Sequence, residues 1–130
     1  MQPRGNKAVV SRFLLEGLGG LNPDVVDEIF APDHVLSSPE FGEQAITGTR
    51  IIKSAIEEFR SDSGWIECTI QRQVEEGEWV ATSYTLTETS DVHMGALFSR
   101  VVSGKIVESS VVARTVSVAE AHITARKAFN

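Results

Sequence analysis

The sequence predicts an α+β fold in which a cone-shaped, curved antiparallel sheet wraps around three helices. The first half of the chain carries apolar residues at helical spacing between glycine and proline signals. From Trp65 onward, apolar and polar residues alternate as they do in strands. The length of 130 residues is that of one domain, which we expect to span 1–130, with a core over 6–115 and an extra C-terminal helix over 117–129.

Each of the three helices has its own start signal. Asn6 can cap the first helix, which the glycines at positions 17, 19 and 20 should end. Asn22-Pro23-Asp24 combines a cap, a proline suited to the first helical position and an acid that favours the helix dipole. Thr49 can cap the third helix. The expected inward residues are Val9, Val10, Phe13, Leu14, Val25, Val26, Ile29, Phe30, Ile51, Ile52, Ala55, Ile56 and Phe59.

The strands of the second half are expected to be joined by hairpin loops of three residues. These loops are 75–77, 89–91 and 102–104, two of which end in glycine. Counting from them places the even-numbered strand residues on the inner face, toward the helices. The odd face is rich in small and β-branched residues and is a plausible dimer surface. A slip of one residue at any hairpin would exchange the two faces beyond it.

Composition excludes several classes of partner. The net charge is −6 without a Lys/Arg cluster, which argues against nucleic acid. No apolar run approaches the length of a membrane span, and the start of the chain lacks a signal-peptide pattern. The single Cys68 fits a reducing cytoplasm, where we expect the protein to reside. The three histidines lack metal-ligand spacing, so no metal and no other cofactor is expected.

Several short motifs resemble those of the SnoaL-like polyketide cyclase branch of the nuclear transport factor 2-like superfamily. They are Asn6-Lys-Ala-Val-Val, Asp27-Glu-Ile-Phe-Ala-Pro-Asp, Gly48 before the third helix, and Arg100 followed by Gly104-Lys-Ile-Val-Glu. The resemblance runs from about Asn6 to Thr115. It implies a conical pocket between sheet and helices, and a homodimer formed through the outer face of the sheet.

The chemistry of that family carries over only in part. Its cyclases commonly follow the turn motif with His-Trp and then an acidic residue that shuttles a proton, and those places hold Ser109, Ser110 and Arg114 here. The family's polar Asp-His-Asp corresponds to Leu36, Ser37 and Ser38. The usual acidic positions are therefore lost.

Three residues are the candidates for catalysis, each with a structural alternative. Arg114 could steady a carboxylate or an enolate, or pair with Glu88 at the rim. Tyr84 could donate a hydrogen bond to a developing oxyanion, or be a core tyrosine satisfied by Ser110 or water. His34 could be a general base, or a residue beside a turn that bonds the backbone. The expected substrate-binding residues are Phe13, Leu36, Phe59, Thr82, Leu86, Met94, Phe98, Ser110 and Val112.

Two functions of different class follow. The first is a cofactor-independent cyclase or isomerase that acts on a small, apolar, polyketide- or terpenoid-like ligand. The second is a non-catalytic ligand-binding or assembly module of the same fold, which the loss of the acidic positions favours.

Overall fold

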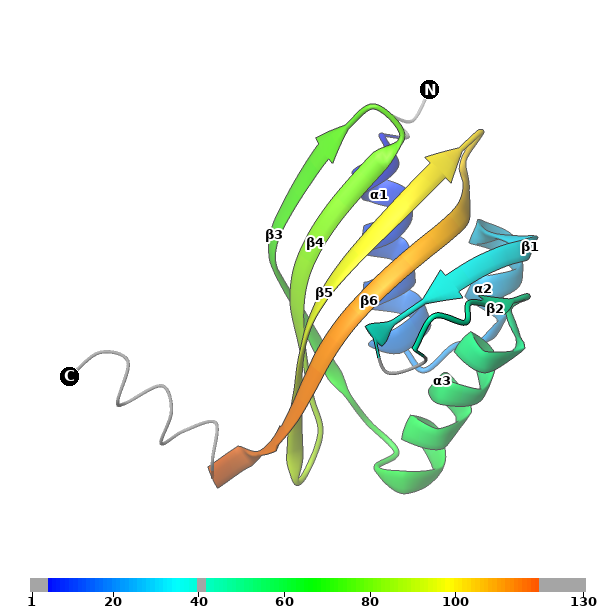
Figure 1. Ribbon diagram of the computed structural model, residues 1–130. Helices are drawn as coiled ribbons and strands as arrows, with labels where there is room; N and C mark the ends of the chain where they lie inside the picture. The colour runs from blue at the N-terminus through cyan, green and yellow to red at the C-terminus, as the bar shows by residue number, and fades with distance from the viewer. Residues whose placement is uncertain (1–4, 40–41, 120–130) are drawn as a thin grey trace.

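The computed structural model describes residues 5–39 and 42–119 and confirms the α+β fold (Figure 1). The first half contains α1 (Asn6–Arg12), a π-helical continuation η1 (Phe13–Leu18), α2 (Asp24–Ile29), β1 (Phe30–Ser37), β2 (Ile46–Thr47) and α3 (Arg50–Asp62). The second half contains β3 (Glu67–Glu76), β4 (Trp79–Thr87), β5 (Asp91–Val102) and β6 (Lys105–Ser117). The predicted helix over 117–129 lies outside the described residues from position 120 onward.

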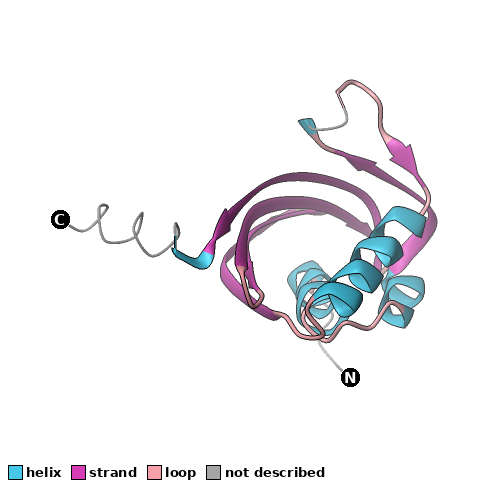
Figure 2. Cartoon of the chain, turned by 90° about the horizontal axis from the view of Figure 1, so that it is seen from below, coloured by secondary structure: helices cyan, strands magenta, loops and turns pink. Residues whose placement is uncertain are grey.

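The strands form a single curved sheet in the order β2-β1-β6-β5-β4-β3. Seen from below, its long strands curve around the helices without closing into a barrel (Figure 2). The sheet is not purely antiparallel, because β1 runs parallel to β6 and places Leu36 opposite Ser109. This parallel pairing joins the two halves of the chain.

The first helix differs in detail from the sequence prediction. Asn6 does not cap α1; instead its Nδ2 donates a hydrogen bond to the Gly77 carbonyl at 3.3 Å and ties the helix to the β3–β4 turn. The helix also continues past Gly17, because the Gly19 amide bonds to the Leu14 carbonyl at 2.9 Å, five residues back. This wider turn is the π-helical geometry, which is frequent at functional sites.

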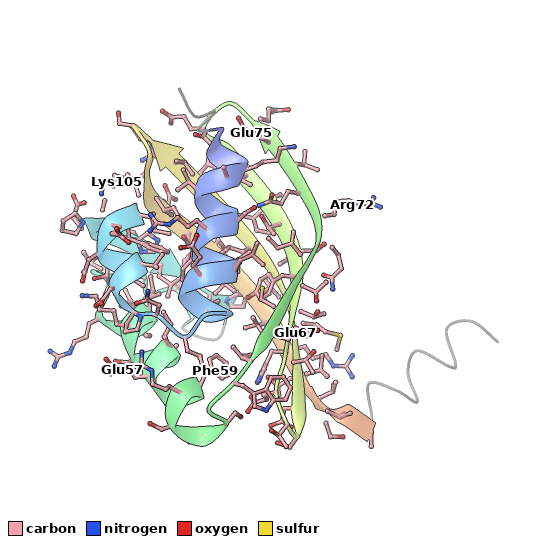
Figure 3. The ribbon with its side chains drawn as sticks, turned by 180° about the vertical axis from the view of Figure 1, so that it is seen from behind. Glu57, Phe59, Glu67, Arg72, Glu75 and Lys105 are labelled. Atoms are coloured by element: carbon pink, nitrogen blue, oxygen red, sulfur yellow. The ribbon has the colours of Figure 1, made fainter. Side chains whose placement is uncertain are left out.

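The inner face of β4 is as predicted. Val80, Thr82, Tyr84 and Leu86 are all buried, whereas their odd-numbered neighbours are more exposed. A bulge in β3 between Ile70 and Arg72 reverses the alternation beyond it. Arg72 therefore projects away from the sheet, as Figure 3 shows.

The register of β5 corrects the prediction by one residue. The last pair before the turn is Thr87 opposite Val92, so the connection is the four-residue stretch 88–91 and not three residues. Every side chain of β5 is therefore exchanged between the faces. Leu97 is 6% exposed inside the sheet, and Phe98 is 44% exposed outside it.

The same exchange extends into most of β6. The β5–β6 turn has two residues, Ser103 and Gly104, and the pairing shifts between Arg100–Glu108 and Val101–Ile106, which leaves Val107 as an extra, bulged residue in β6. Beyond the bulge, odd-numbered residues face the helices, so Ser109 is buried and Val112 is 51% exposed. The even-numbered inner face predicted for β5 and for β6 from position 109 onward is wrong.

The core lies between the concave side of the sheet and the helices. Its members include Val10, Leu14, Val26, Ile56 and Ile106, each at most 1% exposed. Among the described residues, no helix has the length and apolar character needed to span a bilayer. The cytoplasmic location stays a prediction.

Candidate functional site

An apolar cavity of about 340 Å³ lies between the concave face of the sheet and the helices. Its size is at the small end of the range for ligand pockets. It is lined by Phe13, Leu14, Leu18, Phe30, Leu36, Ile51, Ile52, Ala55, Phe59, Tyr84, Leu86, His93, Leu97, Ser109, Val111 and Ala113. No Lys, Arg, Asp or Glu belongs to this described lining, so its polar character comes from Tyr84, His93 and Ser109.

The predicted substrate-binding residues divide into three groups. Phe13, Leu36, Phe59 and Leu86 line the cavity; Figure 3 shows Phe59 at the end of α3 that lies near the start of β3. Thr82 faces inward but lies outside the lining, and its Oγ1 accepts a hydrogen bond from Gln73 at 3.2 Å. The register of β5 and β6 places the remaining residues on the outer face, so their prediction is wrong. They are Met94, Phe98, Ser110 and Val112.

Arg114 also lies on the outer face, and its predicted place in the pocket is wrong. It is exposed and sits opposite Met94 on β5. Glu88, its predicted alternative partner, instead contacts Ser63 and His93. The guanidinium therefore cannot steady a charge inside the cavity.

Tyr84 is placed in the cavity wall as the sequence predicts. It pairs with Gly95 on β5, and a Cβ atom at Gly95 would lie 2.5 Å from the phenol oxygen. The Tyr84 ring can therefore lie over β5 only because residue 95 is a glycine. Within 5–39 and 42–119, no residue makes a hydrogen bond with the Tyr84 hydroxyl. Burial, and secondarily Cys68, raises the pKa of Tyr84. The phenol therefore stays protonated and is available as a donor.

His34 forms a buried pair with Ser109 at one end of the cavity. Its Nε2 lies 2.8 Å from Ser109 Oγ, and its ring meets Phe30 edge-to-face at 4.9 Å. His34 itself is 0% exposed and stands behind Ser109, which lines the cavity. Burial lowers the pKa of His34 to about 4, against the opposing effects of Glu108 and Gly48. The imidazole is thus neutral at pH 7, and its predicted role as a general base is not favoured by so low a pKa.

His93 forms a second pair, with Glu88, which the sequence did not predict. Its Nε2 lies 2.5 Å from Glu88 Oε2, and its Nδ1 lies 2.8 Å from Thr115 Oγ1. The Ser63 hydroxyl donates to the other oxygen of Glu88. The hydrogen bonds from Ser63 and then His93 lower the pKa of Glu88. The carboxylate is therefore ionised near neutral pH.

His93 lies at the boundary between the apolar cavity and a polar recess. Its ring meets Phe59 edge-to-face at 5.2 Å, and both residues line the two spaces. The recess has a volume of about 720 Å³ and is otherwise lined by Ala55, Glu58, Asp62, Ser63, Glu88, Thr89, Ser90 and Asp91. Several of these residues are exposed to solvent. We call this end of the cavity, formed by Phe59, His93 and Glu88, the mouth, and the end formed by Phe30, His34 and Ser109 the closed end.

The sequence analysis did not place His93 and Ser109 in the cavity, and the reason is the same for both. Both are odd-numbered, and the assumed hairpin lengths assigned odd residues to the outer face. The stretch from Val92 to Phe98 has apolar residues at both parities, so alternation alone does not say which face is buried.

Comparison with known proteins identifies the family. The chain matches the model of the SnoaL-like domain over residues 10–109, while no curated protein matches it. Among solved structures, IdmH of Streptomyces antibioticus, for which polyketide cyclase activity is suggested, has a TM-score of 0.69 at 18% identity and covers 83% of this chain and 91% of its own.

Two further structures agree with this result. A suggested ketosteroid isomerase from Kribbella flavida DSM 17836 has a TM-score of 0.69 at 21% identity and covers 84% of this chain and 77% of its own. A suggested SnoaL-like polyketide cyclase from Jannaschia Sp. CCS1 has a TM-score of 0.69 at 18% identity, with coverages of 95% and 96%. At these identities the structures show the fold alone. With the match to the family model, they establish that the chain belongs to the SnoaL-like domain family of the nuclear transport factor 2-like superfamily.

Proposed function

We propose that this protein is a cofactor-independent isomerase or cyclase that moves protons on a small apolar carbonyl compound of polyketide or terpenoid type. The observation that carries the proposal is the apolar cavity with, in its wall, a Tyr84 hydroxyl that makes no hydrogen bond to any described residue. A phenol that stays protonated can hold a carbonyl oxygen and stabilise the enolate formed from it. The activities suggested for IdmH and for the Kribbella protein support this class of reaction by analogy only.

His93 is the group that we propose for proton transfer. A proton leaves the carbon next to the carbonyl for His93 Nδ1, and the electron pair moves to the oxygen bound by Tyr84. Glu88, 2.5 Å from Nε2, stabilises the resulting imidazolium. Return of the proton from His93 to the far carbon of a neighbouring C=C bond completes an isomerisation. In a cyclisation the enolate carbon attacks a second carbonyl of the ligand, and the alkoxide that results takes the proton back from His93. Nδ1 must first exchange its contact with Thr115 for the ligand.

The test follows proton abstraction directly and does not require the natural substrate. The protein is incubated with tetralone in D2O, and replacement of the protons next to the carbonyl by deuterium is followed by NMR. We expect wild-type protein to accelerate the exchange, and Tyr84→Phe to lower the acceleration about 100-fold, the typical loss of an oxyanion donor. Arg114→Ala, on the outer face, is the control and should exchange like wild type. Equal rates in wild type and Tyr84→Phe would contradict the proposal.

A non-catalytic ligand-binding module is the second candidate. It is favoured by the fact that both ring nitrogens of His93 already have protein partners. Calorimetric titration with tetralone, run beside the exchange experiment, separates the two candidates. Binding by wild-type protein without any acceleration of exchange would favour the binding module.

We also propose that the outer face of the sheet forms a homodimer. Four large apolar side chains are exposed on it, and small residues such as Ala81 and Ala96 lie between them. The exposed apolar residues are Val74, Trp79, Phe98 and Val112, at 59%, 42%, 44% and 51%. A contiguous exposed apolar patch of this kind is typical of a protein–protein contact.

A further inference from the structure

The closed end of the cavity contains more polar groups than its apolar surroundings require. Ser109, 3% exposed, contacts the cavity, and His34 lies behind it at 2.8 Å. Ser99 stands opposite Ser109 on β5 and is 0% exposed. Three polar side chains therefore meet where the neighbouring lining consists of phenylalanine, leucine and valine.

One of these side chains has a buried atom without a partner, and a second is weakly satisfied. Within the described residues, Ser99 Oγ is buried and makes no hydrogen bond. His34 Nδ1 is buried and has no hydrogen bond of good geometry, although the Gly48 backbone acts on the ring and raises its pKa. An unpaired buried atom is rare in folded proteins, because it loses its hydrogen bonds to water without replacement. A Ser–His pair that served only to join β1 to β6 would not need a further unpaired polar atom beside it. This end of the cavity is thus suited to receive a polar group.

We propose that Ser109, held by His34, anchors an uncharged oxygen of the ligand at the closed end, while Tyr84 binds the carbonyl nearer to the mouth. This inference rests on the proposed function and narrows its substrate class. The ligand would be an apolar compound with two separated oxygen functions, a carbonyl and a hydroxyl or second carbonyl.

The charge of the ligand follows from the lining. No Lys or Arg belongs to the described lining of the cavity, so a carboxylate at Ser109 would lose its hydration without gaining a counter-charge. Burial lowers the pKa of His34 to about 4, so at neutral pH the ring supplies no positive charge. The same weak basicity, with no carboxylate bonded to His34 among the described residues, argues against Ser109 as a nucleophile.

The spacing of the two anchoring residues limits the size of the ligand. Tyr84 lies in one row of the sheet with Gly95 and Ala113, and Ser109 is four residues from Ala113 along β6. At roughly 3.3 Å per residue this is a separation of about 13 Å along the strand. Two hydrogen bonds and a fused bicyclic skeleton span such a distance.

The test compares matched ligands in matched variants. Tetralone, a ring-hydroxylated tetralone and a tetralone carboxylic acid are titrated by calorimetry into wild type, Ser109→Ala and Ser110→Ala. Ser110 is the control, because it lies next to Ser109 on the same strand and faces outward. We expect wild type and Ser110→Ala to bind hydroxytetralone about fivefold more tightly than tetralone, as one hydrogen bond provides, and the acid more weakly than either. Ser109→Ala should bind tetralone unchanged and lose the fivefold preference.

Three outcomes would overturn the anchoring role. In the first, Ser109→Ala still binds hydroxytetralone more tightly than tetralone. In the second, Ser109→Ala loses affinity for tetralone and hydroxytetralone equally. In the third, wild-type protein binds these two ligands with equal affinity. Equal binding by wild type can occur while deuterium exchange still depends on Tyr84. In that case the anchoring role of Ser109 is contradicted and the proposed function is not. The opposite result is also possible: Ser109→Ala could lose the preference for hydroxytetralone while Tyr84→Phe leaves the exchange rate unchanged. This would support the anchoring role of Ser109 and contradict the proposed function.

A second measurement does not depend on any variant. The ring nitrogens of His34 are followed by NMR in wild-type protein during both titrations. We expect hydroxytetralone, but not tetralone, to shift the Nε2 resonance, because only the hydroxyl changes the hydrogen bonding of Ser109. Identical spectra with both ligands would overturn the proposal.

Discussion

The two ends of the cavity each place a histidine beside a partner, and they give it opposite chemistry. At the closed end His34 is fully buried, pairs with an uncharged hydroxyl and has a pKa lowered to about 4. At the mouth the side chain of His93 is 19% exposed and pairs with the carboxylate of Glu88. Burial without a counter-charge keeps the imidazole of His34 neutral, whereas His93 has an ionised carboxylate and exposed residues beside it.

In the proposed function the two ends divide their tasks. A neutral pair recognises a ligand oxygen without changing its own charge. His93, beside the Glu88 carboxylate, is the group proposed to take up and return the proton. The predictions below test this division, beginning with the largest effect.

Replacement of His93 should have the largest effect, and it should act on the rate. His93→Gln removes the proposed proton acceptor, and we expect deuterium exchange into tetralone to slow at least 100-fold, the lower range for a general base. His34→Gln should instead act mainly on the affinity for hydroxytetralone. Rates at saturating ligand, measured for both variants, separate the two effects. A similar fall in saturated rate in the two variants would contradict the division.

The stability of the protein should depend on pH through His34. Its folded pKa of about 4 lies below the ordinary value of 6.5, so the unfolded chain binds more protons between these values. Stability is therefore fully present above pH 6.5, where the ring is neutral in both states. As pH falls to 4, we expect the free energy of unfolding to decrease by on the order of 3 kcal/mol, because the fold keeps the ring uncharged while the unfolded chain protonates it.

Urea unfolding at pH 6.5 and pH 4 measures this dependence. His34→Gln, which has no titrating group at this position, should lose correspondingly less stability between the two values. An unchanged difference in the variant would show that His34 does not cause the loss.

A smaller effect is expected from Glu88 at the mouth. Its pKa is lowered in the fold, so its contribution to stability is present above the ordinary value of 4.5 and is lost as pH falls below it. At pH 7 we expect Glu88→Gln to reduce the free energy of unfolding by about 1–2 kcal/mol, because the charged partner of Ser63 and His93 is removed. Glu58→Gln, in the same recess but exposed, is the control and should stay within about 0.5 kcal/mol of wild type. Equal stability of the two variants at pH 7 would contradict this role for Glu88.

Substitutions on the outer face of the sheet should have the smallest effect on ligand binding, because this face belongs to neither end of the cavity. Phe98→Ser replaces an exposed apolar side chain and should convert the proposed dimer to a monomer without changing tetralone binding. Light scattering during size-exclusion chromatography measures the mass. A monomeric wild-type protein, or a variant that stays dimeric, would contradict the proposed interface.

Much of the architecture could be predicted from local patterns. The order of the three helices and of β3 to β6, the inner face of β4 and the position of Tyr84 are as expected, because helical spacing and strand alternation are visible within short segments. Four of the nine predicted substrate-binding residues line the cavity, and they lie on η1, β1, α3 and β4. Their orientation does not depend on the register of β5 and β6.

The remaining features depend on strand register, which local patterns do not determine. A four-residue connection before β5 exchanges its faces, and this moves Arg114 outward and His93 inward. Both faces of β5 carry apolar residues, so the alternation fits either choice.

By itself, then, the sequence determined the family, the order of elements and the phenol in the cavity wall. Only the tertiary structure decided which polar residues accompany that phenol. The parallel pairing of β1 with β6 brings His34 to Ser109, 75 residues away along the chain. Contacts over such separations depend on how strands dock and where bulges lie, and those are properties of the packed sheet as a whole.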